Sequence, residues 1–368
     1  MKKTLFALAV LAASSAATAQ SSVTLFGIVD TNFQSVRGDG NGHLNRLGNS
    51  GINTSRLGVR GTEDLGGGLA ASFHLEGPLS TDDGRAGGSI AATNQATTVA
   101  SNQGLNFSRR STVSLAGPFG EVRLGRDYVP SYWNLLVFDP FGNVGVGSAT
   151  NLSQAVAVPQ GSTVITTALR ASNGIHYFVP GNLGGFYGQA MYALGENASN
   201  VGATKDDGRH VGIRVGYASG PVNVAFGAGR TDLQAVNDYK TWNLGASYNF
   251  GVATAMAQFA QEKTNTGLNA TELKNRSWLI GATVPVGAGQ VRAAFTSAKI
   301  DRINLADAKG RQFAIGYLHN LSKRTAVYTN YARISNEAGG EVFFANGRAA
   351  TQVGGDTSGF EVGIRHGF

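Results

Sequence analysis

The residues with the clearest chemical potential in this sequence are arginines that recur at even spacing among apolar neighbours. Arg56 and Arg60 alternate with apolar residues, and Arg123 has an apolar neighbour on each side. Arg110 and Arg170 begin further segments of the same alternating kind. A guanidinium group stays charged in proteins and donates hydrogen bonds in a fixed fork. Residues of this type attract and orient anions without making or breaking bonds.

The sequence carries no motif for bond chemistry, so we expect neither an enzyme nor a cofactor. The six His residues lack the spacing of metal ligands, and there is no Cys. No nucleophile-elbow or Walker-type motif is present. The pairs Asp82-Asp83 and Asp206-Asp207 lie in long predicted loops. We expect solvated charge there, with a loop-bound Ca²⁺ as the alternative.

Residues 1–19 predict an export signal. They combine a basic head, an apolar stretch over 5–13 and the small-residue cleavage site Ala17-Thr18-Ala19. The apolar stretch is too short for a membrane-spanning helix, which needs roughly 20 residues. We therefore expect one exported domain over 20–368. Its basic character, with a net charge of +7 for the whole chain, favours anions or anionic lipid over nucleic acid in an exported protein.

The elements that position the arginines are segments of about ten residues in which polar and apolar residues alternate. Leu69, Ala71 and Phe73, for example, alternate with polar or small residues. Such strands present one face to oil and the other to water. In hydrocarbon, only helices or closed sheets satisfy every backbone N–H and C=O. The chain lacks long apolar helices, so the pattern predicts an all-β, closed transmembrane barrel. An arginine on its lipid face would cost about 2–4 kcal/mol, so the arginines should face the lumen.

The predicted connections alternate between seven short turns and eight long loops, which implies sixteen antiparallel strands. The long loops are predicted at 38–51, 80–106, 128–169, 197–207, 234–237, 264–272, 302–309 and 337–355. A sixteen-stranded barrel is too wide for side chains to fill, so its interior holds water. Aromatic residues near the predicted strand ends are typical of interfacial girdles. The alternative is a soluble sandwich with an aromatic core, which at this length would need two domains, and no linker is present.

Several blocks of this sequence resemble the general porins of Gram-negative outer membranes, and most closely the anion-selective porins of betaproteobacteria. The resemblance extends over the whole exported part of the chain. Its blocks are SSVTLFG at 21–27, TSRLG at 54–58, RGTEDLGGGL at 60–69, RRS at 109–111, FGEVRLGR at 119–126, LSKRT at 321–325 and GIRHGF at 363–368.

The resemblance implies a homotrimer of sixteen-stranded barrels in the outer membrane, in contact with lipid and lipopolysaccharide. It implies that the third loop, 128–169, folds into the lumen, with a short helix expected near 130–136. It also implies that the terminal Phe368 is the signal read by the barrel-assembly machinery. Basic residues on strands two, four and six would form the positive wall of a constriction.

Carried onto this sequence, those wall positions are Arg56, Arg109 or Arg110, and Arg170. The alternation of side chains along the strand (its parity) places Arg110 on the inner face, whereas the resemblance favours Arg109. A β-bulge near the strand end would let both assignments hold. Arg60 and Arg123 are further lumenal candidates by parity. The expected acidic partners are Glu76 and Asp139, the only carboxylate within 128–169. The alternative is that these arginines only form structural ion pairs: Arg109, Arg110, Arg123 and Arg126 would pair with Glu121, Asp127 or the second loop of a neighbouring subunit.

Pore selectivity depends on width and on the charges that line the narrowest part. We therefore expect a passive channel for small hydrophilic solutes with a preference for anions. The alternative with the same fold is a substrate-specific channel with a saturable solute site and stacked aromatic residues in its lumen. An outer-membrane enzyme or an adhesin is disfavoured, because catalytic spacing and very long loops are missing.

Overall fold

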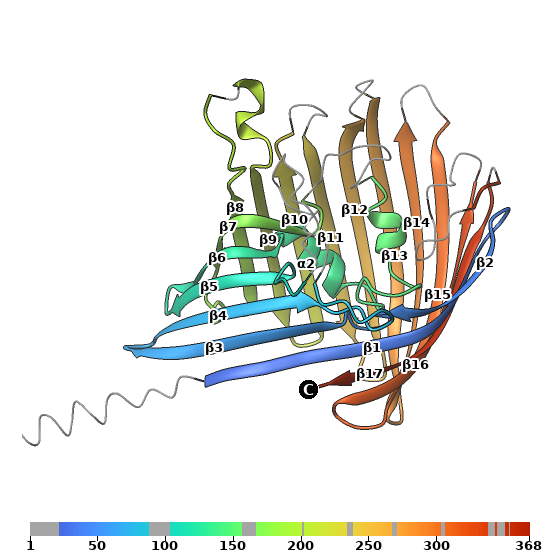
Figure 1. Cartoon of the computed structure of the whole chain (residues 1–368), viewed down its shortest axis with the longest axis horizontal. Helices are drawn as coiled ribbons and strands as arrows, with labels where there is room; N and C mark the ends of the chain where they lie inside the picture. Colours follow the sequence, from blue (N-terminus) through green and yellow to red (C-terminus); the bar gives the residue numbers. More distant parts are fainter. Residues whose placement is uncertain are drawn as a thin grey trace, which may run out of the picture.

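A single antiparallel sheet closes on itself in the computed structural model of this chain (Figure 1). The structure describes residues 22–87, 104–156, 167–200, 202–233, 238–266, 271–302, 306–337, 343, 350–352 and 354–368. The predicted export signal at 1–19 lies outside the described residues, as do parts of every predicted long loop except 38–51. No helix in the described part of the chain is long and apolar enough to cross a membrane.

In the described part of the chain, the elements follow one another as neighbouring strands with two short helices and one 3₁₀ turn between them. They are β1 (Ser22–Gly38), β2 (Gly42–Asn49), β3 (Arg56–Gly66), β4 (Leu69–Pro78), β5 (Arg110–Gly117), β6 (Gly120–Tyr128), α2 (Pro130–Val137), α3 (Thr150–Ser153), β7 (Arg170–Phe178), β8 (Phe186–Ala193), η1 (Gly202–Asp206), β9 (His210–Ser219), β10 (Val222–Thr231), β11 (Tyr239–Asn249), β12 (Thr254–Thr266), β13 (Thr271–Val286), β14 (Gly289–Arg302), β15 (Ala308–Asn320), β16 (Thr325–Asn336) and β17 (Thr357–Gly367).

The barrel has sixteen strands, as predicted, because β2 and β3 together form the second one. The first half of β1 pairs with β3 and its second half pairs with β2. The segment 50–55 interrupts the strand between them. β17 pairs with both β16 and β1, which closes the ring. The long loop predicted at 38–51 is wrong, because β1 and β2 are joined by a tight turn at 39–41. Two glycines with positive φ, Gly40 and Gly42, make that turn possible.

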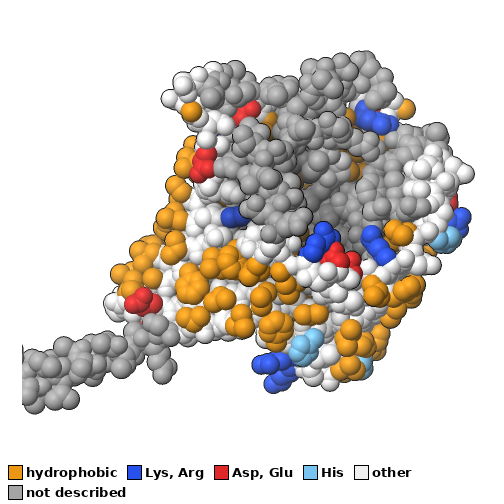
Figure 2. All heavy atoms as spheres, viewed as in Figure 1, with side chains coloured by type: hydrophobic (Ala, Val, Ile, Leu, Met, Phe, Trp, Pro, Cys, Tyr) orange, Lys and Arg blue, Asp and Glu red, His pale blue; other side chains and the backbone are white. Residues whose placement is uncertain are grey.

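Side chains alternate between an apolar outer face and a polar inner face, as the strand pattern predicted. On β5, Val113 and Leu115 are 55% and 41% exposed, whereas Thr112 and Ser114 between them are 6% and 7% exposed. Figure 2 shows hydrophobic side chains gathered in a band across the outer face of β3 to β6. This reversal of the soluble pattern is what a sheet needs when lipid surrounds it and water fills it.

The chain that follows β6 packs against the polar inner face of distant strands. α2 confirms the short helix predicted near 130–136, and it contacts β9, β10 and β11. Amide side chains on the strands donate to the backbone of both short helices: Asn243 on β11 to the Ser131 carbonyl of α2 at 2.9 Å, and Asn275 on β13 to the Leu152 carbonyl of α3 at 2.8 Å. Gln312 on β15 donates to the carbonyls of residues 147 and 148 at 3.0 and 3.1 Å.

An apolar cluster completes this packing. Phe141 and Val146 from the same segment pack with Val36 on β1, Leu279 on β13 and Ala314 on β15. The segment 128–156 is therefore fixed to opposite parts of the ring by both hydrogen bonds and buried apolar contacts.

Candidate functional site: an arginine cluster on the inner face

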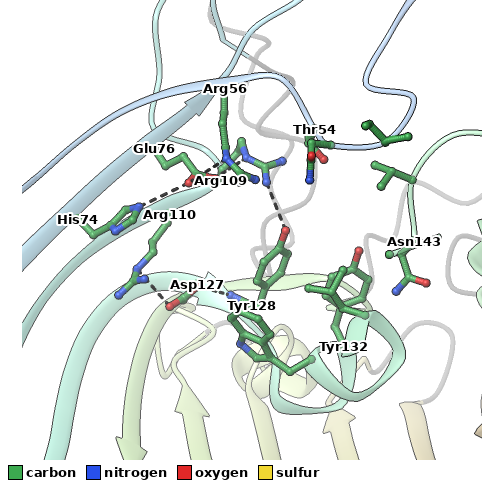
Figure 3. A pocket seen from close by; sticks show the side chains of 16 residues that line it. Thr54, Arg56, His74, Glu76, Arg109, Arg110, Asp127, Tyr128, Tyr132 and Asn143 are labelled. Carbon is green, nitrogen blue, oxygen red and sulfur yellow. Dashed lines mark hydrogen bonds and ion pairs between the residues drawn. The ribbon is translucent and has the colours of Figure 1, made fainter. Parts of the chain in front are cut away.

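A cavity of about 380 Å³ lies between strands β3 to β6 and the segment 128–144 (Figure 3). Its charged lining residues come from four consecutive strands or their ends: Arg56, Glu76, Arg109, Arg110 and Asp127. On each of these strands every second side chain points to the inner face, and the charged residues that line the cavity are among them or lie next to the strand end. The cavity therefore collects residues that are far apart in the sequence but adjacent across the sheet.

Glu76 is the centre of the first group of charges. Its Oε1 accepts a hydrogen bond from Arg109 Nε at 2.6 Å, and its Oε2 lies 3.7 Å from Arg56 Nε. His74 Nε2 lies 3.5 Å from the same Oε2 atom. Arg109 also donates to the Tyr128 hydroxyl at 3.3 Å. The single negative charge of Glu76 thus faces the positive charges of two guanidinium groups, and the group has a net positive charge.

Asp127 is the centre of the second group. Arg123 Nη1 lies 2.6 Å and Arg110 Nε lies 3.4 Å from Asp127 Oδ2. Arg123 also binds Glu121 at 2.9 Å, and its guanidinium carbon lies 4.2 Å from the Phe178 ring centroid. Arg123 is therefore neutralised by two carboxylates and lies outside the cavity lining, whereas Arg110 has to share Asp127 with Arg123.

Arg109 and Arg110 both reach the cavity, which explains why parity and resemblance disagreed. Arg110 is the first residue of β5 and has the parity of Thr112, to which its Nε donates at 3.1 Å. Arg109 precedes the strand, so strand alternation does not dictate its direction. Its amide donates to the Glu76 carbonyl at 3.1 Å, which keeps the two side chains together.

Two further arginines lie behind the cavity. Arg170 Nε donates to the Arg109 carbonyl at 2.7 Å, and its guanidinium carbon lies 4.2 Å from the Tyr128 ring centroid. Arg126, which was not among the predicted wall residues, donates to the Ser108 carbonyl at 2.6 Å. In the described part of the chain, neither arginine has a carboxylate within ion-pair distance. Their charges therefore add to those of the cavity.

The cluster as a whole has an excess of three positive charges. Its six arginines are Arg56, Arg109, Arg110, Arg123, Arg126 and Arg170. Its three carboxylates are Glu76, Glu121 and Asp127. Arg60, the remaining predicted arginine, lies apart from the cavity, with its guanidinium carbon 5.1 Å from the Phe26 ring centroid.

Asp139 does not face the arginines, which corrects the expectation that it forms the opposing acidic wall. Its Oδ1 accepts the Phe141 amide at 2.9 Å, and its Oδ2 accepts the amides of Asn143 and Ala149 at 2.9 and 3.0 Å. Burial raises the pKa of Asp139, and these three donors together with the nearby Arg292 partly offset that rise. The carboxyl organises the turn of its own loop.

The wall opposite the arginines is aromatic and uncharged. Tyr128 lies 4.9 Å from Tyr132 and 5.2 Å from Trp133, measured between ring centroids. All three residues line the cavity, together with Leu136 and Asn143. Strand alternation could not predict that these residues line the cavity, because all but Tyr128 lie on α2 or in the loop after it.

Metal binding has no support among the described residues, where no group of three or more His, Cys, Asp and Glu could hold an ion. The two aspartate pairs were considered as an alternative Ca²⁺ site. In the first pair, Asp83 forms an ion pair with Arg85. Asp206 pairs with Lys205 at 2.8 Å and with Arg209 at 3.3 Å. These carboxylates already have basic partners.

A closed barrel with an apolar exterior and a charged interior belongs to the class of outer-membrane channel proteins. The sequence profile of the Gram-negative porin family matches residues 5–339, and the chain belongs to that family of non-enzymatic channels. It is 43% identical over 379 positions to outer membrane porin protein 32 of Delftia acidovorans, with all of both chains covered. Its place is the outer membrane of a Gram-negative cell.

Solved structures agree with this assignment. An anion-selective porin from Comamonas acidovorans is 40% identical, with a TM-score of 0.78 and coverage of 95% of this chain and 100% of that one. A trimer form of OmpT from Vibrio cholerae has a TM-score of 0.62 at 14% identity, covering 95% and 99% of the two chains. The second likeness shows the fold alone.

Proposed function

We propose that this porin is a general diffusion channel for small hydrophilic solutes and that it prefers anions. The observation that carries the proposal is the excess of three positive charges in the arginine cluster, opposite a wall without carboxylates. The similar structure described as an anion-selective porin supports it. We further propose that the segment 128–156 narrows the lumen at the level of the cluster, so that every permeating ion passes close to it.

The magnitude of the field is sufficient for a preference without a tight binding site. One unit charge ~8 Å from a passing ion contributes about 0.5 kcal/mol at the dielectric constant of water. Three such charges sum to about 1.5 kcal/mol, which corresponds to roughly tenfold in an equilibrium constant. Salt weakens this field, because the Debye length is about 10 Å at 0.1 M.

Reversal potentials across planar bilayers with a salt gradient test the proposal. We expect the wild-type channel to favour chloride over potassium, and Arg56→Gln combined with Arg110→Gln to lose most of that preference. The matched control is Arg37→Gln combined with Arg333→Gln, two exposed arginines on the outer face. A cation-selective wild-type channel, or equal selectivity in the two double variants, contradicts the proposal.

The aromatic wall favours a second candidate function, a channel with a saturable site for anionic organic solutes. Tyr128, Tyr132 and Trp133 face Arg56 and Arg109 across the same cavity, which suits a planar carboxylate. Such a solute should block ion current with a saturable dose dependence, and Trp133→Ala should abolish the block. A current that falls only in proportion to added solute favours simple diffusion.

We also propose that the protein is exported with cleavage after Ala19 and assembles as a homotrimer through the barrel-assembly machinery, guided by Phe368. These steps rest on family membership and on the N-terminal pattern. Mass spectrometry of the mature N-terminus should give Gln20. Unheated electrophoresis should give a trimer, and deletion of Phe368 should lower the amount of folded protein in the membrane.

A further inference from the structure

Arg214 on β9 is an inner-face arginine that lies outside the arginine cluster. Its neighbours along the strand, Ile213 and Val215, are 46% and 49% exposed on the outer face, so alternation turns Arg214 into the lumen. In the described part of the chain its polar partners are the neutral side chains of Asn134 and Tyr187, and no carboxylate lies within ion-pair distance. Arg214 therefore carries a positive charge that no ion-pair partner balances.

Asn134 and Tyr187 hold the Arg214 guanidinium group in one orientation. Its Nε donates to Asn134 Oδ1 at 2.5 Å, and its Nη2 donates to the Tyr187 hydroxyl at 3.2 Å. The guanidinium carbon also lies 4.7 Å from the Tyr187 ring centroid. A guanidinium group has five N–H donors, so these two bonds leave about three of them for water or a solute.

The two residues that hold Arg214 are themselves fixed. Asn134 Nδ2 donates to the Ala225 carbonyl on β10 at 2.8 Å, and the Tyr187 hydroxyl donates to Asn223 Oδ1 at 2.7 Å. The Tyr187 ring occupies the space that a Cβ atom on its register partner, Gly216, would fill. The guanidinium group is therefore preorganised, and this lowers the entropic cost of a contact with an anion.

The Arg214 group and the arginine cluster lie at different depths of the barrel. Tyr187 and Asn223, next to the Arg214 guanidinium, are the second residues of β8 and β10 and follow short turns directly. Arg56 and Arg170 of the cluster are instead the first residues of β3 and β7, at the strand ends opposite the short turns. Short turns face the periplasm in outer-membrane barrels. The cluster is therefore nearer to the cell exterior, and the Arg214 group is nearer to the periplasm.

We propose that Arg214, held by Asn134 and Tyr187, is a second contact point for small permeating anions, in the periplasmic half of the pore. Helix α2 contacts both positive groups, because its Tyr132 and Trp133 line the cluster cavity whereas its Asn134 reaches Arg214. An anion that has passed the cluster meets a second positive charge before it reaches the periplasm. This inference rests on the proposed anion preference and adds a second position along the pore at which that preference acts.

The test measures reversal potentials of the folded full-length porin, inserted from one side of a planar bilayer, with a potassium chloride gradient applied in both directions. With about 0.1 M salt on one side and about 0.01 M on the other, the Debye lengths are about 10 and 30 Å, so fixed charge nearer to the dilute side dominates selectivity. We expect Arg214→Gln to lower the anion-to-cation permeability ratio about fourfold with a dilute periplasmic side, and at most about twofold with a dilute loop side. Arg56→Gln should show the opposite dependence on the direction of the gradient.

Arg230→Gln is the matched control, because Arg230 is an exposed arginine on the outer face of the neighbouring strand β10. It should leave the permeability ratio nearly unchanged in both directions. An anion-selective wild type in which Arg214→Gln acts equally in both directions, or with the same dependence as Arg56→Gln, overturns this inference and leaves the proposed function standing. A wild type without anion preference refutes the proposed function, and this inference with it.

A second variant tests the same charge without removing the arginine. Asn223→Asp keeps the acceptor for the Tyr187 hydroxyl and places a negative charge two hydrogen bonds away from Arg214. If Arg214→Gln does not fold, Asn223→Asp should still lower the permeability ratio at least about twofold with a dilute periplasmic side. An unchanged ratio in Asn223→Asp then refutes the proposal.

Discussion

Glu76→Gln offers the sharpest test of the arginine cluster, because it changes the charge and keeps the shape. The Glu76 carboxylate lies within 2.6 to 3.7 Å of nitrogen atoms of Arg109, His74 and Arg56. A glutamine retains an oxygen that can accept the hydrogen bond from Arg109. The substitution therefore raises the charge excess of the cluster from three to four without opening the cavity.

The expected size of the effect follows from Coulomb's law. One added positive charge ~8 Å from the ion path attracts an anion and repels a cation by about 0.5 kcal/mol each in water, so the difference is about 1 kcal/mol. At 0.1 M salt, screening leaves somewhat under half of this, which is about twofold in the permeability ratio. At 0.01 M salt, where the Debye length is about 30 Å, we expect about fourfold.

Reversal potentials at the two salt concentrations measure this directly. Glu76→Gln should become more anion-selective than the wild type, and more so at low salt. Glu63→Gln is the matched control, because it makes the same substitution at an exposed position of β3. Glu63 lies on the outer face, opposite to the face that carries Arg56. If the anion-to-cation permeability ratio does not change in Glu76→Gln, or shifts towards cations, the reasoning that the cluster acts through its static charge is refuted.

Three further outcomes are expected. Gln312→Leu removes the donor to the carbonyls of Gly147 and Ser148, so the segment 128–156 should loosen and single-channel current should become larger and noisier. Arginine at the lipid-facing Val113 should destabilise the barrel by about 2–4 kcal/mol in urea titrations in lipid, whereas arginine at Ser114 should cost much less. Because burial raises the pKa of Asp139, the folded chain holds that proton more tightly than the unfolded chain. Stability should therefore fall as pH rises from the ordinary aspartate pKa to the raised one, and Asp139→Asn should lose this slope in pH-dependent unfolding.

The strand pattern predicted the barrel well because a membrane imposes a strict rule on every strand. Each residue faces lipid or water, so period-two alternation carries both strand position and side-chain direction. Val113 and Thr112 lie on the faces that parity assigned to them. The split of the second strand was not predictable in this way. The segment 50–55 carries Gly, Ser, Asn and Thr, which read equally well as part of a loop.

The site was less predictable because its decisive residues lie where strands end. Arg109 precedes β5, and Arg170 begins β7 beyond an irregularity in its pairing with β6. Alternation no longer dictates side-chain direction at such positions. Asp139 was misplaced for a different reason. A lone acid in a long loop can face the pore or bind its own backbone amides, and only the loop conformation decides between them.

The interruption of the second strand also sets the position of Arg56 in the arginine cluster. Asp30 Oδ2 on β1 accepts the amides of Ile52 and Asn53 at 2.9 and 2.7 Å, and Ser55 Oγ binds the Asp30 backbone. These bonds hold 50–55 against β1, so that β3 restarts at Arg56 beside Glu76. A continuous second strand would shift the register between β1 and Arg56, because the two halves pair with β1 four residues out of step. The buried aspartate therefore fixes the position of Arg56 in the arginine cluster, although it lies outside the cavity itself.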